Sequence, residues 1–254
     1  MAKVAVVTGA NKGLGLALVK GLCQELNGIV YLTSRDLKRG LKACNILKFQ
    51  GLDPEFHHLN ITDNEGIQEF VKFIKDKHEK IDILINNAGV LFLKDAPEPK
   101  TFQAEQTLLV NFYSLVNFTE AMLPLIRENG TILNISSSRL KRNGPRVSEE
   151  CEDEYRYQSL GLITVRRIQS GCNAYTFMLN RRLAPSHITV NCVHPGYVIS
   201  DMTNGAGSIT PEQGAVIPLQ LALHPENGGL YVWHDGSRVP WDGPDPRGYI
   251  DRIL

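Results

Sequence analysis

Short apolar runs alternate with amphipathic stretches along almost the whole chain. The run "VAVVTG" at 4–9 is continuously apolar and ends in a turn, which is typical of a strand buried on both faces. The segment 14–26 has leucines at helical spacing and predicts a helix. The same order then repeats, and the pattern predicts further strands at 29–34, 55–60, 81–86, 131–136, 188–193 and 229–233.

Local start and stop signals support the helices between these strands. Asp36 is placed to cap the helix that follows the second strand, and Thr62 opens a capping-box match before the next helix. A long helix is expected over 102–127, where Pro124 should bend or end it. Thr210 begins another capping-box pattern and predicts a late helix.

Repeated strand–helix–strand units predict a parallel sheet with helices on both faces. Right-handed crossovers make this a doubly wound, Rossmann-type α/β sheet of seven strands, with its ligand at the carboxyl ends of the strands. No repeat or linker divides the chain, so we expect a single nucleotide-binding domain over 1–254. Two stretches depart from the rhythm: a charged loop at 139–158, and a final strand with a Gly/Pro-rich tail at 229–254.

Composition narrows the class of protein. Of 254 residues, 43% are hydrophobic and 21% charged, and the net charge is zero, which argues against a nucleic-acid partner. No signal-peptide pattern follows Met1 and no long apolar run is present, so we expect a cytoplasmic protein without a membrane partner. The five cysteines are scattered, which favours reduced thiols. We expect no metal site, since His57 and His58 face opposite sides of a strand.

A glycine-rich turn follows the first predicted strand. In "TGANKGLG" at 8–15, Gly9, Gly13 and Gly15 allow a tight turn and let the backbone approach a pyrophosphate. The helix that begins there offers free N–H groups and a partial positive charge. A glycine pattern alone is weak evidence, but this one has the strand–turn–helix context that dinucleotide binding requires.

The end of the second strand indicates which dinucleotide. An acidic residue at this place favours NAD, whereas a cation favours the 2′-phosphate of NADP. The chain has Arg35 here, and Lys12 in the glycine turn can meet the same phosphate. Asp36 is interpreted as the helix cap. The sequence therefore predicts NADP(H) as cofactor.

Further motifs give the chain a family resemblance. "NNAG" at 86–89, "NISS" at 134–137, "NAYT" at 173–176 and "HPGYVISDM" at 194–202 follow the glycine turn in order and spacing. Together they resemble the short-chain dehydrogenase/reductase family, and in particular its NADPH-dependent carbonyl reductases. The resemblance implies hydride transfer to a small-molecule carbonyl (an aldehyde, ketone or quinone). A further helix is expected at about 160–183, and the longer segment before it resembles the insertion of the monomeric carbonyl reductases, so a monomer is favoured.

The resemblance also assigns the cofactor contacts. Lys12 and Arg35 would hold the 2′-phosphate, and Asn60 would lie beside the adenine, where many relatives carry Asp. Ser200 stands where the family often has Thr, so the hydroxyl is kept. The expected cofactor set is Gly9, Asn11, Lys12, Gly13, Leu14, Gly15, Arg35, Asn60, Ile61, Asn87, Ala88, Gly89, Gln169, Pro195, Gly196, Val198 and Ser200.

Two catalytic residues follow from the same resemblance. In the family an Asn supports a proton relay and a Ser holds the substrate oxygen. Asn111 matches the Asn, although a polar residue satisfied by backbone would look the same. Ser137 matches the Ser, with Ser136 and Ser138 as alternatives, since strand alternation alone does not choose among them.

The family's proton donor is missing from its expected place. Relatives use a Tyr whose pKa is lowered by a Lys four residues later, on the same helix face. Aligning "NAYT" puts these positions at Val165 and Gln169. Valine has no proton to give. Glutamine can bond a ribose hydroxyl but carries no charge to lower a phenol pKa.

Three hypotheses follow. The first is a working reductase that uses water or a displaced Tyr155, Tyr157 or Tyr175 as the acid. The second is a family member that binds NADPH but reduces poorly. The third concerns the segment 138–171 itself: the resemblance stops and resumes abruptly at its ends, as a shifted reading frame, an alternative exon or an artefact would cause.

Overall fold

The computed structural model describes residues 2–93, 95–136 and 163–239, and between 163 and 170 it describes the backbone alone. The charged loop predicted at 139–158 and most of the C-terminal tail lie outside this part. So do Ser137, Ser138, Tyr155 and Tyr157.

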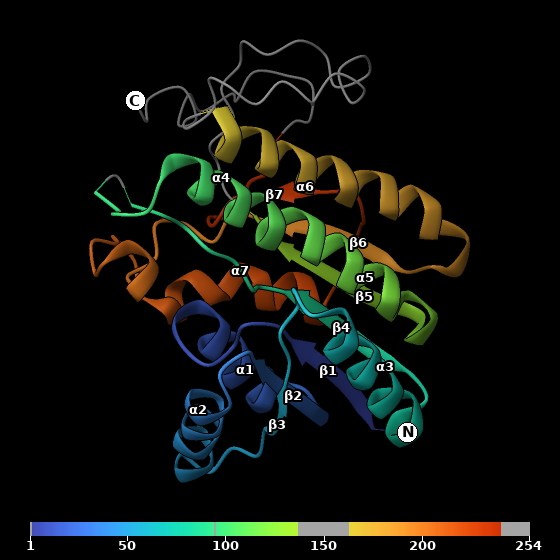
Figure 1. Ribbon diagram of the computed structural model, residues 1–254. Helices are drawn as coiled ribbons and strands as arrows, with labels where there is room; N and C mark the ends of the chain where they lie inside the picture. The colour runs from blue at the N-terminus through green and yellow to red at the C-terminus, as the bar shows by residue number, and fades with distance from the viewer. Residues whose placement is uncertain (1, 94, 137–162, 240–254) are drawn as a thin grey trace.

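The described strands form one parallel sheet of seven, in the order β3-β2-β1-β4-β5-β6-β7 (Figure 1). The strand order reverses between β1 and β4, which is the switch point where such sheets bind ligands. The predicted doubly wound fold is confirmed. The strands are β1 Lys3–Val7, β2 Gly28–Ser34, β3 Glu55–His58, β4 Ile81–Asn86, β5 Ile126–Ile135, β6 Thr189–Val193 and β7 Tyr231–Val232.

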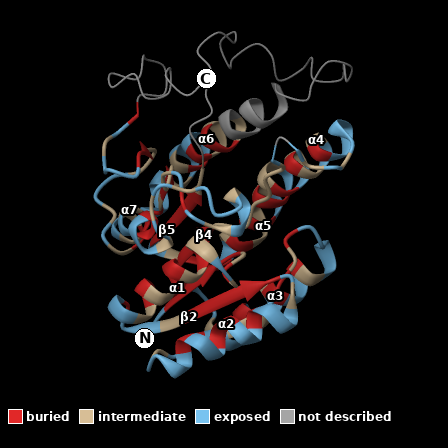
Figure 2. Cartoon of the chain, turned by 90° about the vertical axis from the view of Figure 1, so that its left-hand side faces the viewer, coloured by how far each residue is buried: buried red, intermediate tan, exposed pale blue. Residues whose placement is uncertain are grey.

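Helices cover both faces, and the strands between them are largely buried (Figure 2). One face packs against α1 Gly13–Glu25, α2 Leu37–Phe49 and α7 Pro211–Leu223. The other packs against α3 Asn64–His78, α5 Leu115–Met122 and α6 Ile163–Leu183. The π-helical η1 Leu109–Ser114 joins α4 Lys100–Leu108 to α5, and three 3-10 turns complete the described helices: η2 Leu123–Leu125, η3 Ala184–Ser186 and η4 Asp201–Thr203.

Most element boundaries agree with the sequence, and the differences have local causes. Asp36 caps α2, as predicted, because its Oδ1 accepts the N–H of Arg39 at 2.9 Å. The cap of α3 is Asp63, not Thr62; Thr62 instead donates to the Oδ1 of Asn60. Strand β5 starts five residues before the predicted 131, at Ile126, with an irregular register against β4.

The stretch Lys100–Leu125 is the one described helical run that is long and apolar enough to suit a membrane span. This is weak evidence, because the core helix of a soluble protein passes the same test. Here Val110, Phe118 and Met122 are buried against the sheet. Packing in the fold therefore accounts for the apolar face of this run. As expected, Pro124 lies in its last turn.

Candidate functional site

The glycine turn is held against the end of β4 by hydrogen bonds. The Thr8 hydroxyl accepts the N–H groups of Asn87 and Ala88, both at 3.0 Å. The Asn87 amide donates to the carbonyls of Thr8 and Gly9. Gly9 has a φ of +62°, and a Cβ there would lie 2.8 Å from the Cα of Ala88. Only glycine fits this close approach, so the glycine turn and the "NNAG" segment form one rigid unit.

Helix α1 begins at this turn with its N–H groups uncapped. Lys12 occupies the N-cap position, its side chain makes no cap hydrogen bond, and the first turn contains no acidic residue. The first-turn N–H groups can therefore donate to an anion. The loop after β6 closes the other side, where Ser200 Cβ lies 3.5 Å from the place a Cβ on Gly13 would take.

A basic cavity of about 350 Å³ adjoins the turn. Its described lining holds three cations, Lys12, Arg39 and Lys42, and one carboxylate, Asp201. The other lining residues are Asn11, Leu16, Ala43 and Ile46. Three cations against one carboxylate leave a net charge suited to a phosphate group.

The cavity changes the predicted phosphate contacts. Lys12 and Asn11 line it as expected, but Arg35 is exposed at the end of β2 and does not. The Arg35 carbonyl instead accepts a hydrogen bond from His58 Nε2 at 3.0 Å. Sequence reasoning missed Arg39 and Lys42. Their spacing in the first turns of α2, one turn and two turns after Arg35, was a usable signal.

The adenine-side residues lie at the end of β3. Asn60 is half-buried, and its Oδ1 accepts the N–H and the hydroxyl of Thr62 at 3.2 and 3.0 Å. Ile61 is buried in the core. The Asn60 amide nitrogen remains available as a donor in this arrangement, so the predicted adenine contact stays a prediction.

The loop after β6 carries the four residues predicted beside the nicotinamide: Pro195, Gly196, Val198 and Ser200. The Gly196 N–H donates to His194 Nδ1 at 2.8 Å. The imidazole of His194 stacks on Trp233 with ring centroids 4.3 Å apart. Burial lowers the pKa of His194 to about 4, so the ring is neutral and supports the loop without charge.

Asn111 lies in η1 and binds the backbone that follows "NNAG". Its Nδ2 donates to the carbonyl of Val90 and its Oδ1 accepts the N–H of Val90, both at 2.8 Å. A Cβ on Gly89 would lie 3.4 Å from the same Oδ1. The side chain thus fixes the chain after Gly89, and its predicted part in a proton relay stays a prediction.

Helix α6 is docked on the sheet by buried polar groups. Asn86 donates to Asn134, and Asn134 donates to Thr176, both at 2.8 Å. The Ser136 hydroxyl donates to Asn173 Oδ1 at 2.5 Å. This bond uses the proton of Ser136, and the choice of Ser137 as the catalytic serine stays a prediction.

Val165 and Gln169, where the resemblance puts the family's Tyr and Lys, precede Asn173 on the same helix. Positions 169 and 165 lie four and eight residues before it in α6. The side chains of Val165 and Gln169 lie outside the described residues.

Tyr175 belongs to a different face of α6. Its hydroxyl donates to Glu120 Oε1 at 2.8 Å, and Arg182 binds the same carboxylate. Burial and the nearby Glu120 raise the pKa of Tyr175. As expected, this tyrosine is in the packed part of the helix, and its hydroxyl bonds Glu120, which is not among the predicted cofactor contacts.

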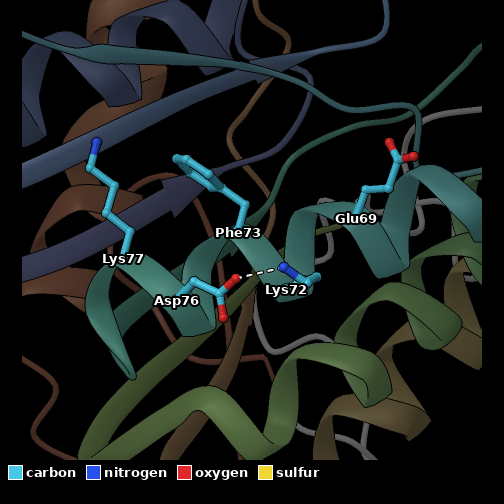
Figure 3. A pocket seen from close by; sticks show the side chains of 5 residues that line it. All are labelled: Glu69, Lys72, Phe73, Asp76 and Lys77. Atoms are coloured by element: carbon cyan, nitrogen blue, oxygen red, sulfur yellow. Dashed lines mark hydrogen bonds and ion pairs between the residues drawn. The ribbon is translucent and has the colours of Figure 1, made fainter.

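A second hollow, of about 450 Å³, lies on the outer side of α3 (Figure 3). Glu69, Lys72, Phe73, Asp76 and Lys77 line it, and Lys72 pairs with Asp76 at 2.8 Å. None of the predicted site residues is among them. The charged flank of a surface helix explains this hollow.

Comparison with known proteins identifies the family. The family model described as short chain dehydrogenase matches residues 3–149. The chain belongs to the short-chain dehydrogenase family. Carbonyl reductase (NADPH) 3 of Mus musculus is 33% identical, and the match spans 88% of this chain and 91% of that protein. Carbonyl reductase (NADPH) 1 of Sus scrofa is also 33% identical, and the match spans 97% of this chain and 96% of that protein.

Solved structures agree with this membership of the short-chain dehydrogenase family. Salutaridine reductase from Papaver somniferum superposes with a TM-score of 0.77 at 26% identity, over 90% of this chain and 99% of that one. A short chain dehydrogenase from Burkholderia cenocepacia J2315, in complex with NADP, superposes with a TM-score of 0.75 at 21% identity. The match spans 92% of this chain and 97% of that one. The second likeness shows the fold alone.

Proposed function

We propose that this chain binds NADP(H), with the pyrophosphate at the start of α1 and the 2′-phosphate in the basic cavity. The observation that carries this proposal is the uncapped α1 N-terminus beside a cavity lined by Lys12, Arg39 and Lys42. The tight Gly9–Ala88 approach holds the turn in a fixed position before the start of α1. The relatives named above are NADPH reductases by name, which supports the same choice.

The reaction we propose is reduction of an aldehyde, ketone or quinone to an alcohol. The bound cofactor would supply a hydride to the carbonyl carbon, and water or a displaced tyrosine would supply the proton that the oxygen takes up. The chain's own contribution is positioning: Asn87 holds the glycine turn and Asn111 fixes the backbone after Gly89. The loop from Pro195 would hold the nicotinamide. Ser137 would donate a hydrogen bond to the substrate oxygen as negative charge develops on it.

A second candidate is an NADPH-binding protein with little turnover. The sequence at Val165 and Gln169 favours it, because neither residue replaces the family's Tyr and Lys. A positioned proton donor contributes roughly 10²–10⁴-fold to rate. Its loss would slow reduction far more than it would weaken NADPH binding, since the glycine turn and Lys12 are intact.

One experiment separates these candidates. The purified chain is titrated with NADPH and NADH by fluorescence, and NADPH oxidation is then followed with a panel of aldehydes, ketones and quinones. Binding with turnover supports the reductase, and binding without turnover supports the second candidate. Binding of neither dinucleotide contradicts both.

The alignment of α6 has its own test. We expect Val165→Tyr together with Gln169→Lys to raise turnover by about 10²–10⁴-fold over the native chain. Each single change serves as the matched control, because the Tyr needs the Lys to lower its pKa. No gain from the double variant, with NADPH binding intact, would mean that other positions face the nicotinamide. Independent transcripts read across codons 138–171 test the reading-frame hypothesis.

A further inference from the structure

The loop between β6 and α7 is a hydrogen-bonded unit that packs on the glycine turn. The Ile199 N–H donates to the Ile209 carbonyl at 2.8 Å, and the Thr203 hydroxyl donates to Val198 O at 2.9 Å. Ser200 caps the short helix η4 and touches the space above Gly13. The first residue of η4 is Asp201. The loop therefore holds this carboxylate at a defined place beside the start of α1.

Asp201 is paired with the lysine that the cofactor needs. Lys12 Nζ lies 2.6 Å from Asp201 Oδ2. The two side chains are 52% and 74% exposed, so water can replace either partner at little cost. The hydrogen bond from Lys12 lowers the pKa of Asp201, which keeps the carboxylate charged at neutral pH.

The charges around the cavity make this pair significant. Asp201 is the one carboxylate among the described lining residues. Arg39 is already engaged, since its Nε lies 3.3 Å from Asp36 Oδ2. A phosphate monoester would bring a charge of about −1.5 to −2 at pH 7 into this space. It would meet a like charge in Asp201, and of the three cations it would find Lys12 paired with Asp201, Arg39 paired with Asp36, and Lys42 beside them.

We propose that Asp201 competes with the 2′-phosphate for Lys12 and so limits the preference of this site for NADPH over NADH. The proposal rests on the proposed function and adds a specificity-determining residue to it. An exposed ion pair is weak, so the competition is modest: its removal should tighten NADPH about threefold to fivefold. NADH has no 2′-phosphate, so its affinity should stay the same. Added salt should shrink the difference, because both charges are exposed.

The experiment compares Asp201→Asn with the native chain. Dissociation constants for NADPH, NADH and adenosine 2′,5′-bisphosphate are measured by calorimetry at low and at high salt. Asp53→Asn is the matched control, since Asp53 forms an exposed pair with Lys48 at 3.4 Å outside the cavity. The same change is then made in a Lys12→Gln background. The melting temperature of each variant is measured to verify that it folds.

The results decide between clear alternatives. Tighter binding of NADPH and of the bisphosphate by Asp201→Asn, with NADH unchanged and the gain lost in the Lys12→Gln background, supports the proposal. Unchanged or weaker NADPH binding overturns it, and so does a gain that persists without Lys12. If the native chain and all variants bind neither dinucleotide, the proposed function itself is wrong and the inference goes with it.

Discussion

Gly9→Ala is expected to damage both the fold and the cofactor site. The native φ of +62° is unfavourable for alanine by about 1–2 kcal/mol. The new Cβ would lie 2.8 Å from Ala88 Cα and 3.0 Å from Ala88 Cβ. The Ala88 backbone, in the turn after β4, cannot move aside as a flexible side chain would, and such overpacking costs about 1–3 kcal/mol. The sum is a loss of about 2–5 kcal/mol in the free energy of unfolding.

Gly51→Ala is the matched control for this change. Gly51 also has a positive φ, +80°, but a Cβ there would meet nothing within 4 Å. It should lose only the conformational part, about 1–2 kcal/mol. Urea unfolding of both variants measures the difference in their free energies of unfolding. NADPH titration measures how far the displaced turn lowers the affinity for NADPH. Equal losses in the two variants would refute the steric reasoning, and unchanged NADPH affinity in Gly9→Ala would refute the role of the turn.

Two further predictions concern side chains near the site. Tyr175→Phe removes one hydrogen bond to Glu120 and should lower the free energy of unfolding by about 1–2 kcal/mol. NADPH affinity and turnover should change less than about twofold. A hundredfold loss of turnover would instead make Tyr175 the displaced acid. Because burial holds the pKa of His194 at about 4, the unfolded chain binds this proton first as the pH falls. The free energy of unfolding should therefore drop between about pH 6.5 and pH 4, by up to about 3 kcal/mol. His194→Gln should flatten that interval of a urea-unfolding profile, and an unaltered profile would assign the pH dependence to other groups.

The fold was predictable because its signals are local and mutually consistent. Strands such as β1 and β4 are buried on both faces and need continuous apolar runs, so the sequence displays them directly. Asp36 and Thr210 cap helices through bonds that span three residues. Where two caps compete within a few residues, as at Thr62 and Asp63, pattern matching does not choose. The early start of β5 at Ile126 depends on pairing with a neighbouring strand, which no local pattern encodes.

The candidate site was predictable only where a motif carries it. The glycine turn and "NNAG" were found as separate motifs, and the hydrogen bonds from Asn87 that join them required the fold. The pairing of Lys12 with Asp201 links residues 189 positions apart, so no local pattern indicates it. Arg35 is the predicted contact because it ends the strand, whereas the cavity is bounded by α2, through Arg39 and Lys42.

The central claim is that a 2′-phosphorylated dinucleotide lies at the start of α1. Calorimetric titration of the purified native chain with NADPH and with NADH tests it most directly. We predict a measurable heat with NADPH and an affinity at least about tenfold above that for NADH, since only NADPH has a 2′-phosphate to place in the proposed cavity of Lys12 and Arg39. Absence of heat with both dinucleotides, or tighter binding of NADH, would contradict the account.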